Sequence, residues 1–212
     1  RILVTRIDRI GDVILTTPVF EKIKQVYPAA FLAVLVSPLT ASIVQGNPFV
    51  DKVFVYDKKG AEKSWLGTWS FAHDLKREAF DAVIHFHSTN RVFWLSFLAR
   101  VPIRIGFNRK CSWLLTHPLE ERKWEGTKHE SEYNLELLEK ALGILEQKFG
   151  RPSVALPREN YSTFVPLDGK DKRSLIKKVP EILEKSFIVL SPSASCPSKR
   201  WPSENFAQKF EK

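Results

Sequence analysis

Short apolar runs alternate with longer amphipathic runs through the first half of this 212-residue chain. The apolar runs are typical of buried strands, and the amphipathic runs have the spacing of helices that pack on one side. We expect strands at 2–5, 31–36, 53–56, 82–86 and 103–105, and helices at 13–26, 39–45, 65–80 and 92–100. Alternation at this spacing predicts βαβ units and therefore an α/β fold with a parallel sheet.

The turns that follow parallel strands lie together at the carboxyl edge of the sheet, where open α/β folds bind ligands. The first of these turns has the sequence Arg6-Ile-Asp8-Arg9-Ile-Gly11-Asp12. The other turns are polar or charged as well, and they lie at 37–38, 57–63, 87–91 and 106–109. We therefore expect the polar residues of this half of the chain to converge on one edge.

Asp12 is the carboxylate of greatest interest in the first turn, because a helix is expected to begin beside it. A carboxylate there can stabilise the positive end of the helix dipole, or it can point outward and act as a general base. Spacing alone favours the stabilising role. The helix N-terminus should also lower the pKa of Asp12 and keep it ionised. Gly11 is expected to permit the turn and a close approach of a ligand to the backbone.

Two further predictions concern helices of the first domain. Trp65 and Trp69 are four residues apart, so we expect them to form one core-facing stripe of their helix. The segment 107–128 has no clear period, whereas 129–142 has the apolar stripe of a helix, with Gly143 as its C-cap.

The domain organisation follows from composition and periodicity along the chain. We expect residues 1–150 to form the first domain, and 151–169, which is rich in proline, to form a linker. A basic helix at 171–185 and a strand at 187–190 would then begin a second domain at 170–212. Because the chain stops within an amphipathic run and contains no methionine, we expect it to be part of a longer protein.

Charge and composition exclude several classes of protein. Lys and Arg number 33 against 24 Asp and Glu, so the net charge of +9 favours nucleic acid, phosphorylated small molecules or an anionic membrane as partner. The two cysteines lie far apart and suggest neither a zinc site nor a disulfide framework, which fits a reducing compartment. The sequence contains no phosphate-binding P-loop, dinucleotide fingerprint or nucleophile elbow. Its longest apolar run, 92–99, is far below the roughly 18 residues that span a bilayer.

Three segments together resemble the lipopolysaccharide heptosyltransferases, the inverting glycosyltransferases of family 9 that use ADP-heptose. The first is Arg6–Asp12 with Thr17-Pro18, and the second runs from Phe80 to Phe107. The third is Leu190–Pro202 with Phe206-Ala207. The resemblance covers the whole chain and implies a GT-B architecture. That architecture consists of two Rossmann-like domains with parallel sheets, of which the second is only partly present in these residues.

The resemblance also implies roles for individual residues. It places the catalytic base at Asp12 and the donor-binding residues at Gly11, Ser193, Ser195 and Lys199. A loop rich in small hydroxyl residues before a helix suits a phosphate, and Lys199 would neutralise the departing nucleotide diphosphate in place of a metal. No cofactor is required. The acceptor-binding residues expected from the resemblance and from the strand-end positions are Arg9, Lys59, Lys63, His87, Ser88 and Arg91.

The implied function is transfer of heptose from ADP-heptose to the inner core of lipopolysaccharide. The acceptor is the Kdo/heptose–lipid A core, and the expected location is the cytoplasm, peripheral on an anionic inner membrane face. A transferase of the same fold for another nucleotide sugar is one alternative, and a non-catalytic remnant of that fold is another. A basic nucleic-acid-binding protein is the third, although the charges are scattered and no known binding module is present.

Overall fold

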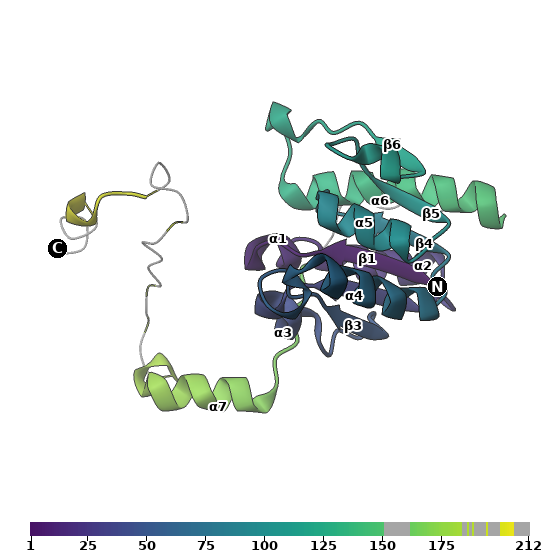
Figure 1. Cartoon of the computed structure of the whole chain (residues 1–212). Helices are drawn as coiled ribbons and strands as arrows, with labels where there is room; N and C mark the ends of the chain where they lie inside the picture. Colours follow the sequence, from purple (N-terminus) through teal and green to yellow (C-terminus); the bar gives the residue numbers. More distant parts are fainter. Residues whose placement is uncertain (151–161, 184–185, 187, 189–193, 195–199, 206–212) are drawn as a thin grey trace. The chain divides into compact units, whose positions relative to one another are not determined.

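The computed structural model describes residues 1–150, 162–183, 186, 188, 194 and 200–205 (Figure 1). The chain divides into two compact units, Arg1–Pro166 and Leu167–Lys212, which are treated separately. The first unit contains every described strand and both polar pockets discussed below.

Six parallel strands form the sheet of the first unit, in the order β3-β2-β1-β4-β5-β6. The strands are β1 (Ile2–Arg6), β2 (Leu32–Val36), β3 (Lys52–Val55), β4 (Ala82–His85), β5 (Ile103–Phe107) and β6 (His117–Leu119). This order is that of a doubly wound sheet, with the reversal between β1 and β4. The predicted α/β class with a Rossmann-like parallel sheet is therefore confirmed.

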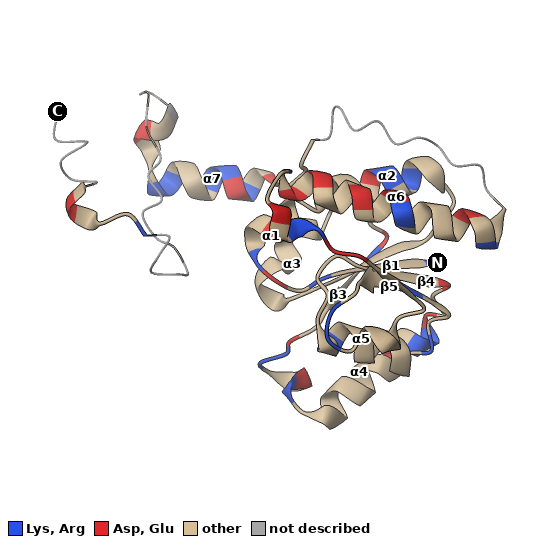
Figure 2. Cartoon of the chain, turned by 90° about the horizontal axis from the view of Figure 1, so that it is seen from above, with Lys and Arg blue, Asp and Glu red and all other residues tan. Residues whose placement is uncertain are grey.

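Helices cover both faces of the sheet (Figure 2). On one face lie α1 (Ile10–Ile14), α2 (Thr17–Val26), α3 (Ala41–Val44) and α6 (Glu130–Phe149). On the other lie α4 (Trp65–Arg77) and α5 (Asn90–Leu98). Side chains alternate along β1, so Ile2 and Val4 pack in the first layer and Leu3 in the second. Every residue of β1 is buried, as expected of a central parallel strand.

Several predicted elements differ from the observed ones. The predicted helix at 13–26 is two helices, since Pro18 lies in the first turn of α2 and the Thr16 hydroxyl donates to the Asp12 carbonyl at the break. Gly143 is wrong as a C-cap, because α6 continues to Phe149 and ends at Gly150, whose φ is 65°. The strand β6 was not expected. It is a three-residue edge strand that contains Pro118, so it carries no apolar run.

Trp65 and Trp69 were expected in the core, and that prediction is wrong. Their exposed fractions are 59% and 57%. The helix α4 instead buries Thr68, Ala72 and Leu75 against the sheet, which is the neighbouring helical stripe. A spacing of four residues correctly placed the two tryptophans on one face of the helix, but it could not show whether that face packs against the sheet.

The longest element in the described part of the second unit is the helix α7 (Gly169–Lys178). Asp168 caps it, accepting hydrogen bonds from the backbone N–H groups of Lys170 and Asp171 at 2.7 and 2.8 Å. A short 3-10 helix, Pro180–Leu183, follows, so the helix predicted at 171–185 is interrupted at Pro180. The predicted strand at 187–190 lies almost entirely outside the described residues, and the predicted linker at 151–169 stays a prediction.

Candidate active site

The carboxyl ends of β1 and β4 lie side by side, at the point where the strand order reverses. A pocket of about 190 Å³ opens there. Its walls come from the ends of β1 and β5, the segments after β1, β4, β5 and β6, and the start of α6. Doubly wound sheets bind ligands at this position. The predicted convergence of the polar strand ends is therefore observed.

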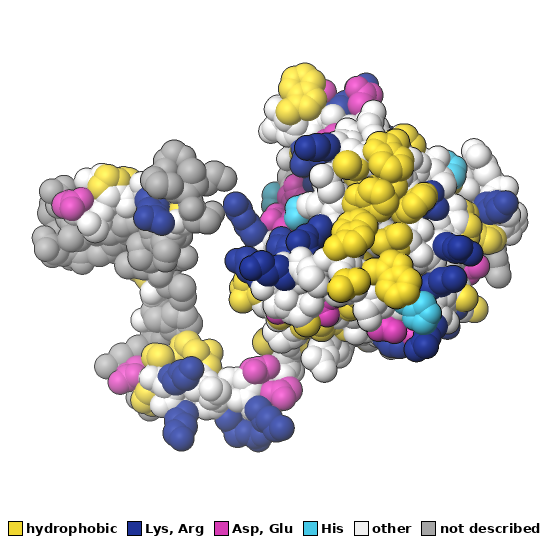
Figure 3. All heavy atoms as spheres, in the orientation of Figure 1, with side chains coloured by type: hydrophobic (Ala, Val, Ile, Leu, Met, Phe, Trp, Pro, Cys, Tyr) yellow, Lys and Arg dark blue, Asp and Glu magenta, His cyan; other side chains and the backbone are white. Residues whose placement is uncertain are grey.

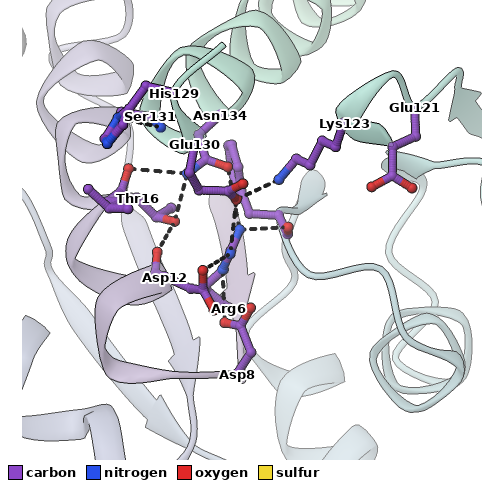
Figure 4. Close-up of polar contacts among 12 residues, drawn as sticks. Arg6, Asp8, Asp12, Thr16, Glu121, Lys123, His129, Glu130, Ser131 and Asn134 are labelled. Carbon is purple, nitrogen blue, oxygen red and sulfur yellow. Dashed lines mark hydrogen bonds and ion pairs between the residues drawn. The ribbon is translucent and has the colours of Figure 1, made fainter. Parts of the chain in front are cut away.

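Arg6, the last residue of β1, is the centre of the pocket wall (Figure 4). Only 4% of its side chain is exposed. The guanidinium donates from Nε to Asp8 Oδ1 at 2.8 Å, and from Nη1 to the Phe86 carbonyl at 2.9 Å. Its Nη2 lies 3.1 Å from Glu130 Oε1 and 3.3 Å from Asp12 Oδ1. A buried cation requires such compensation, so three carboxylates are gathered around one guanidinium.

The helix α6 brings a distant part of the chain to this cluster. Glu130, its first residue, also accepts a hydrogen bond from Lys123 Nζ at 2.5 Å. Asn134, one turn further on, accepts from Arg6 Nη1 at 3.4 Å and donates to Thr16 Oγ1 at 3.2 Å. These contacts connect α6 to the end of β1 and to the junction of α1 and α2. The sequence interpretation missed Glu130 and Lys123, because neither lies in a strand-end turn of the predicted sheet.

Asp12 is held most loosely of the three carboxylates. Its contact with Arg6, at 3.3 Å, is longer than those of Asp8 and Glu130, at 2.8 and 3.1 Å. Its side chain is also the most exposed, at 32% against 15% and 26%. No side chain caps α1, whose N-cap residue is Arg9. Asp12 therefore faces the pocket without serving as a helix cap.

The prediction that the helix lowers the pKa of Asp12 is wrong. Burial raises this pKa above its ordinary value, and the neighbouring Asp8 charge raises it further. Arg6 opposes both effects, while Glu130 adds to them. The helix α1 has only five residues, so its dipole is a small influence beside these close groups. A carboxyl with a raised pKa at a pocket wall is suited to exchange a proton.

Gly11 is not the residue at which the chain turns. The helix begins at Ile10, and Arg9 has the extended backbone that makes the turn. Gly11 is absent from the positive-φ residues, so its conformation does not require glycine. A Cβ added there would meet nothing within 4 Å, which leaves the backbone open to a ligand. The donor-binding role of Gly11 stays a prediction.

A second, larger pocket of about 530 Å³ adjoins the first and shares Asp8 and His87 with it. Its cationic lining residues are Arg9, Lys58 and Lys59. Two carboxylates line it as well, so cations are in excess. The balance differs in the smaller pocket, where four carboxylates face three Lys or Arg side chains. The larger pocket is thus the better site for an anionic ligand.

His87, a predicted acceptor-binding residue, has a ring nitrogen available to a ligand. It lines both pockets, and its buried Nδ1 has no hydrogen-bond partner within the described part of the chain. Burial lowers its pKa, which favours the neutral ring. The neighbouring Ser88 is buried, and its hydroxyl oxygen accepts from the Phe107 N–H at 3.0 Å. Ser88 therefore also connects the ends of β4 and β5.

Lys63 and Arg91 line neither of these pockets. The Arg91 guanidinium donates to the carbonyls of Glu62 and Lys63 at 3.0 and 3.1 Å, and to the Tyr56 hydroxyl at 3.3 Å. These bonds hold the loop between β3 and α4 against α5. The acceptor-binding roles of Lys63 and Arg91 stay predictions, and their observed contacts support the shape of the loop.

His85, two residues before His87, is structural. It is fully buried, and burial lowers its pKa to about 3. Its Nδ1 lies 2.8 Å from Thr5 Oγ1, and its Nε2 lies 3.1 Å from Ser96 Oγ. Since the Ser96 hydroxyl already donates to the Phe93 carbonyl, we assign the His85 proton to Nε2.

The residues predicted for the donor side, Ser193, Ser195 and Lys199, lie outside the described residues. Their roles stay predictions. The site that the structure describes is therefore built on the sheet of the first unit.

Residues 68–212 match the family model described as glycosyltransferase family 9 (heptosyltransferase). The chain belongs to glycosyltransferase family 9. The matched range begins after Asp12, so the catalytic role of that residue in this family 9 protein stays a prediction.

Two curated relatives of this family 9 protein come from Haemophilus influenzae. The first, predicted to be a glycosyltransferase, is 30% identical over 165 residues, which are 77% of this chain and 45% of the relative. The second, the lipopolysaccharide core heptosyltransferase OpsX, is 28% identical over 109 residues, or 51% of this chain and 30% of the relative. The chain thus spans less than half the length of each.

Solved structures of similar fold include a family 9 glycosyltransferase from Veillonella parvula, with a TM-score of 0.76 and 23% identity. The alignment covers 98% of this chain and 58% of that one. The heptosyltransferase WaaC of E. coli, solved with ADP, has a TM-score of 0.66 and 18% identity. That alignment covers 100% of this chain and 63% of WaaC. At these identities the structures show a shared fold, and this family 9 chain spans under two thirds of each.

Proposed function

We propose that this family 9 protein transfers heptose from ADP-heptose to the inner core of lipopolysaccharide, with inversion and with Asp12 as the base. The family description and the name of the relative OpsX support the sugar and the acceptor. The structure of WaaC with ADP supports the nucleotide. A transferase of the same fold that uses another nucleotide sugar is the alternative.

The position of Asp12 carries the proposal. Of the three carboxylates around Arg6, it has the longest contact and the most exposed side chain. The inverting reaction requires a base that removes the proton of the acceptor hydroxyl as its oxygen attacks the anomeric carbon. A new carbon–oxygen bond then forms while the bond to the nucleotide diphosphate breaks, and the proton remains on Asp12.

Arg6 is a positioning residue in this scheme. Its buried guanidinium opposes the effects that raise the pKa of Asp12, and so it favours the ionised form that a base requires. Asp8 and Glu130 hold the guanidinium from other sides. Glu130 is in turn held by Lys123, whereas Asp12 has the longest contact with Arg6 of the three carboxylates.

We assign the acceptor to the basic pocket of about 530 Å³. The inner core of lipopolysaccharide is anionic, and the excess of cations suits it. Arg9, Lys59 and His87 line this pocket and are the proposed acceptor contacts. Ser88 lines the adjoining pocket, and Lys63 and Arg91 belong to the loop and helix that frame the basic one.

We assign the donor to Gly11 and to the segment that contains Ser193, Ser195 and Lys199. In this assignment Lys199 neutralises the diphosphate as it leaves, a role that a metal has in other transferases. The acceptor is anchored in a membrane, so the proposed location is the cytoplasmic face of the inner membrane. No nucleic-acid partner is proposed.

The test uses the whole gene product with ADP-heptose and a core acceptor that lacks heptose. Heptosylated product is expected from the wild-type protein and is expected to fall to the background level with Asp12→Asn. Equal activity of the two proteins would show that Asp12 is not the catalytic base. Product formed from another nucleotide sugar, and none from ADP-heptose, would favour the alternative donor.

A further inference from the structure

A second surface of the first unit lies over α4 and α5, on the face of the sheet opposite α2 and α6. Several large apolar side chains are exposed on it, and Figure 3 shows them as a continuous yellow area. We call this surface the aromatic patch and define it by Trp65, Leu66, Trp69, Phe97 and Trp113. Their exposed fractions range from 42% to 78%. Large contiguous apolar patches on a protein surface mark interaction sites, whereas single exposed apolar residues are common and need no explanation.

Most rings of the aromatic patch are held in place by a shared neighbour, Trp94, while Trp69 stacks on His73 with ring centroids 6.2 Å apart. Trp94, half-buried beneath them, makes edge contacts with Trp65, Phe97 and Trp113, with ring centroids 5.5, 5.9 and 5.6 Å apart. Phe97 and Trp113 also contact each other at 6.5 Å. The patch is therefore ordered before any partner binds, which reduces the entropy lost on binding.

Basic side chains border the patch. A groove of about 570 Å³ beside it is lined by Trp69 and Phe97, and by the cationic residues Lys76, Arg100 and Arg104. None of the described residues that line this groove is a carboxylate. The Arg104 guanidinium also lies 5.6 Å from the centre of the Phe97 ring. Apolar rings and cations thus occupy one continuous surface, to which an anionic and partly apolar partner is complementary.

A bilayer surface with anionic lipids has both properties. Tryptophan is favoured at the boundary between lipid tails and headgroups, because its ring is apolar and its N–H is polar. Lys and Arg beside it are attracted to anionic headgroups. Within the described residues, no helix combines the length and the apolar composition needed to cross a membrane. Attachment through this face would thus be peripheral.

A second copy of the chain fits the surface less well. A two-fold interface brings the same patch of both copies together. Lys76, Arg100 and Arg104 would then approach their own equivalents, and like charges across an interface oppose association.

We propose that the aromatic patch docks on the surface of an anionic lipid bilayer. The tryptophan rings enter the interface, and Lys76 and Arg100 contact lipid phosphates. The inference extends the proposed function, since a lipid-anchored acceptor is reached at a membrane. The loop that bears Lys58 and Lys59 leads directly into α4 at Trp65, so the acceptor pocket and the docking surface adjoin along the chain.

Co-sedimentation with vesicles tests the apolar part of the surface. The wild-type protein is expected to bind vesicles of phosphatidylglycerol and phosphatidylcholine, and to bind pure phosphatidylcholine at least about tenfold more weakly. The double variant Trp65→Gln/Trp113→Gln should lose about tenfold or more of the binding. Trp124→Gln is the matched control, because Trp124 is 82% exposed outside the patch and should bind as the wild type does.

The charged part is tested with Lys76→Glu/Arg100→Glu. This variant should also bind about tenfold or more weakly, and the loss should shrink as salt is raised. Lys140→Glu/Lys148→Glu makes the same change of charge on α6, across the sheet, and should have a much smaller effect. Urea unfolding of every variant separates loss of binding from loss of folding.

Three results would overturn the docking proposal. They are equal binding to neutral vesicles, unchanged binding in both patch variants, and a dimer that the tryptophan variant dissociates. The proposed reaction is tested apart from it with a soluble, deacylated acceptor. Heptose transfer to that acceptor should be the same in the patch variants and the wild type, so either proposal can fail without the other.

Discussion

Arg6 Nη2 lies 3.3 Å from Asp12 Oδ1 at the carboxyl end of the first strand. The same guanidinium contacts Asp8 and Glu130, so one buried cation is shared among three carboxylates. Asp12 is the member of this cluster that opens most to the pocket. Burial and the Asp8 charge raise the pKa of Asp12, and the almost fully buried Arg6 guanidinium opposes them.

Replacing the proposed base should affect turnover more than binding. Asp12→Asn keeps the shape of the side chain and removes its ability to accept a proton. We expect kcat to fall by about 10²–10⁴-fold, with little change in KM for either substrate. Steady-state kinetics measure both quantities. Asp74→Asn, on an exposed carboxylate of α4, is the control and should retain full activity. A large rise in KM with normal kcat would contradict the role.

Removing Arg6 should alter the pH dependence and the stability together. Arg6 lowers the pKa of Asp12, so Arg6→Met should raise that pKa. Activity requires the ionised carboxylate, so the acid limb of kcat/KM should move to higher pH. The variant should also lose about 3–5 kcal/mol of unfolding free energy, because it leaves partly buried carboxylates unpaired.

Arg6→Lys separates these two effects. It keeps the positive charge but not the fork of donors, so it should shift the acid limb less than Arg6→Met does. Rate measurements across pH and urea unfolding supply the two readouts. An acid limb that stays in place in both variants would show that Arg6 does not control Asp12.

His85 should make the fold sensitive to acid. Its pKa is about 3 in the folded chain and near 6.5 when the chain is unfolded. Between these values the unfolded state binds the proton and the folded state does not. This contribution to stability is therefore complete above the unfolded value and is lost as pH falls, by roughly 1.4 kcal/mol per pH unit.

His85→Gln supplies the comparison, because glutamine can hydrogen-bond without titrating in this range. The difference in unfolding free energy between the two proteins should change from pH 7 to pH 4, with the wild type losing more. Urea unfolding at several pH values measures it. If the unfolding free energies of the two proteins changed equally with pH, His85 would not be the source of the acid sensitivity.

Charge reversal in the basic pocket should weaken the acceptor and spare the donor. Lys58 and Lys59 both line this pocket. We expect Lys58→Glu/Lys59→Glu to raise the acceptor KM by about tenfold and to leave the donor KM unchanged. The effect should diminish at high salt. Lys148→Glu, at the end of α6, is the control. An equal rise in the KM values of acceptor and donor would contradict the assignment of this pocket to the acceptor.

Local patterns in the sequence were sufficient for the fold class and for the edge of the sheet at which the candidate site lies. Apolar runs such as Leu32–Val36 identified buried strands, and handed crossovers then put the strand-end turns on one edge. The patterns did not reveal β6, whose three residues include Pro118. They also misplaced Trp65 and Trp69, because helical spacing identifies a face but not what covers it.

The sequence by itself determined an α/β chain with Asp12 at the carboxyl edge of a parallel sheet, since strand and helix periods are local properties. Only the tertiary structure placed Glu130 against Arg6, across 124 positions of the chain. It also decided the direction of the pKa shift of Asp12 and the exposure of the aromatic patch. These properties depend on burial and on charges within a few ångströms, and both come from residues that only folding brings together.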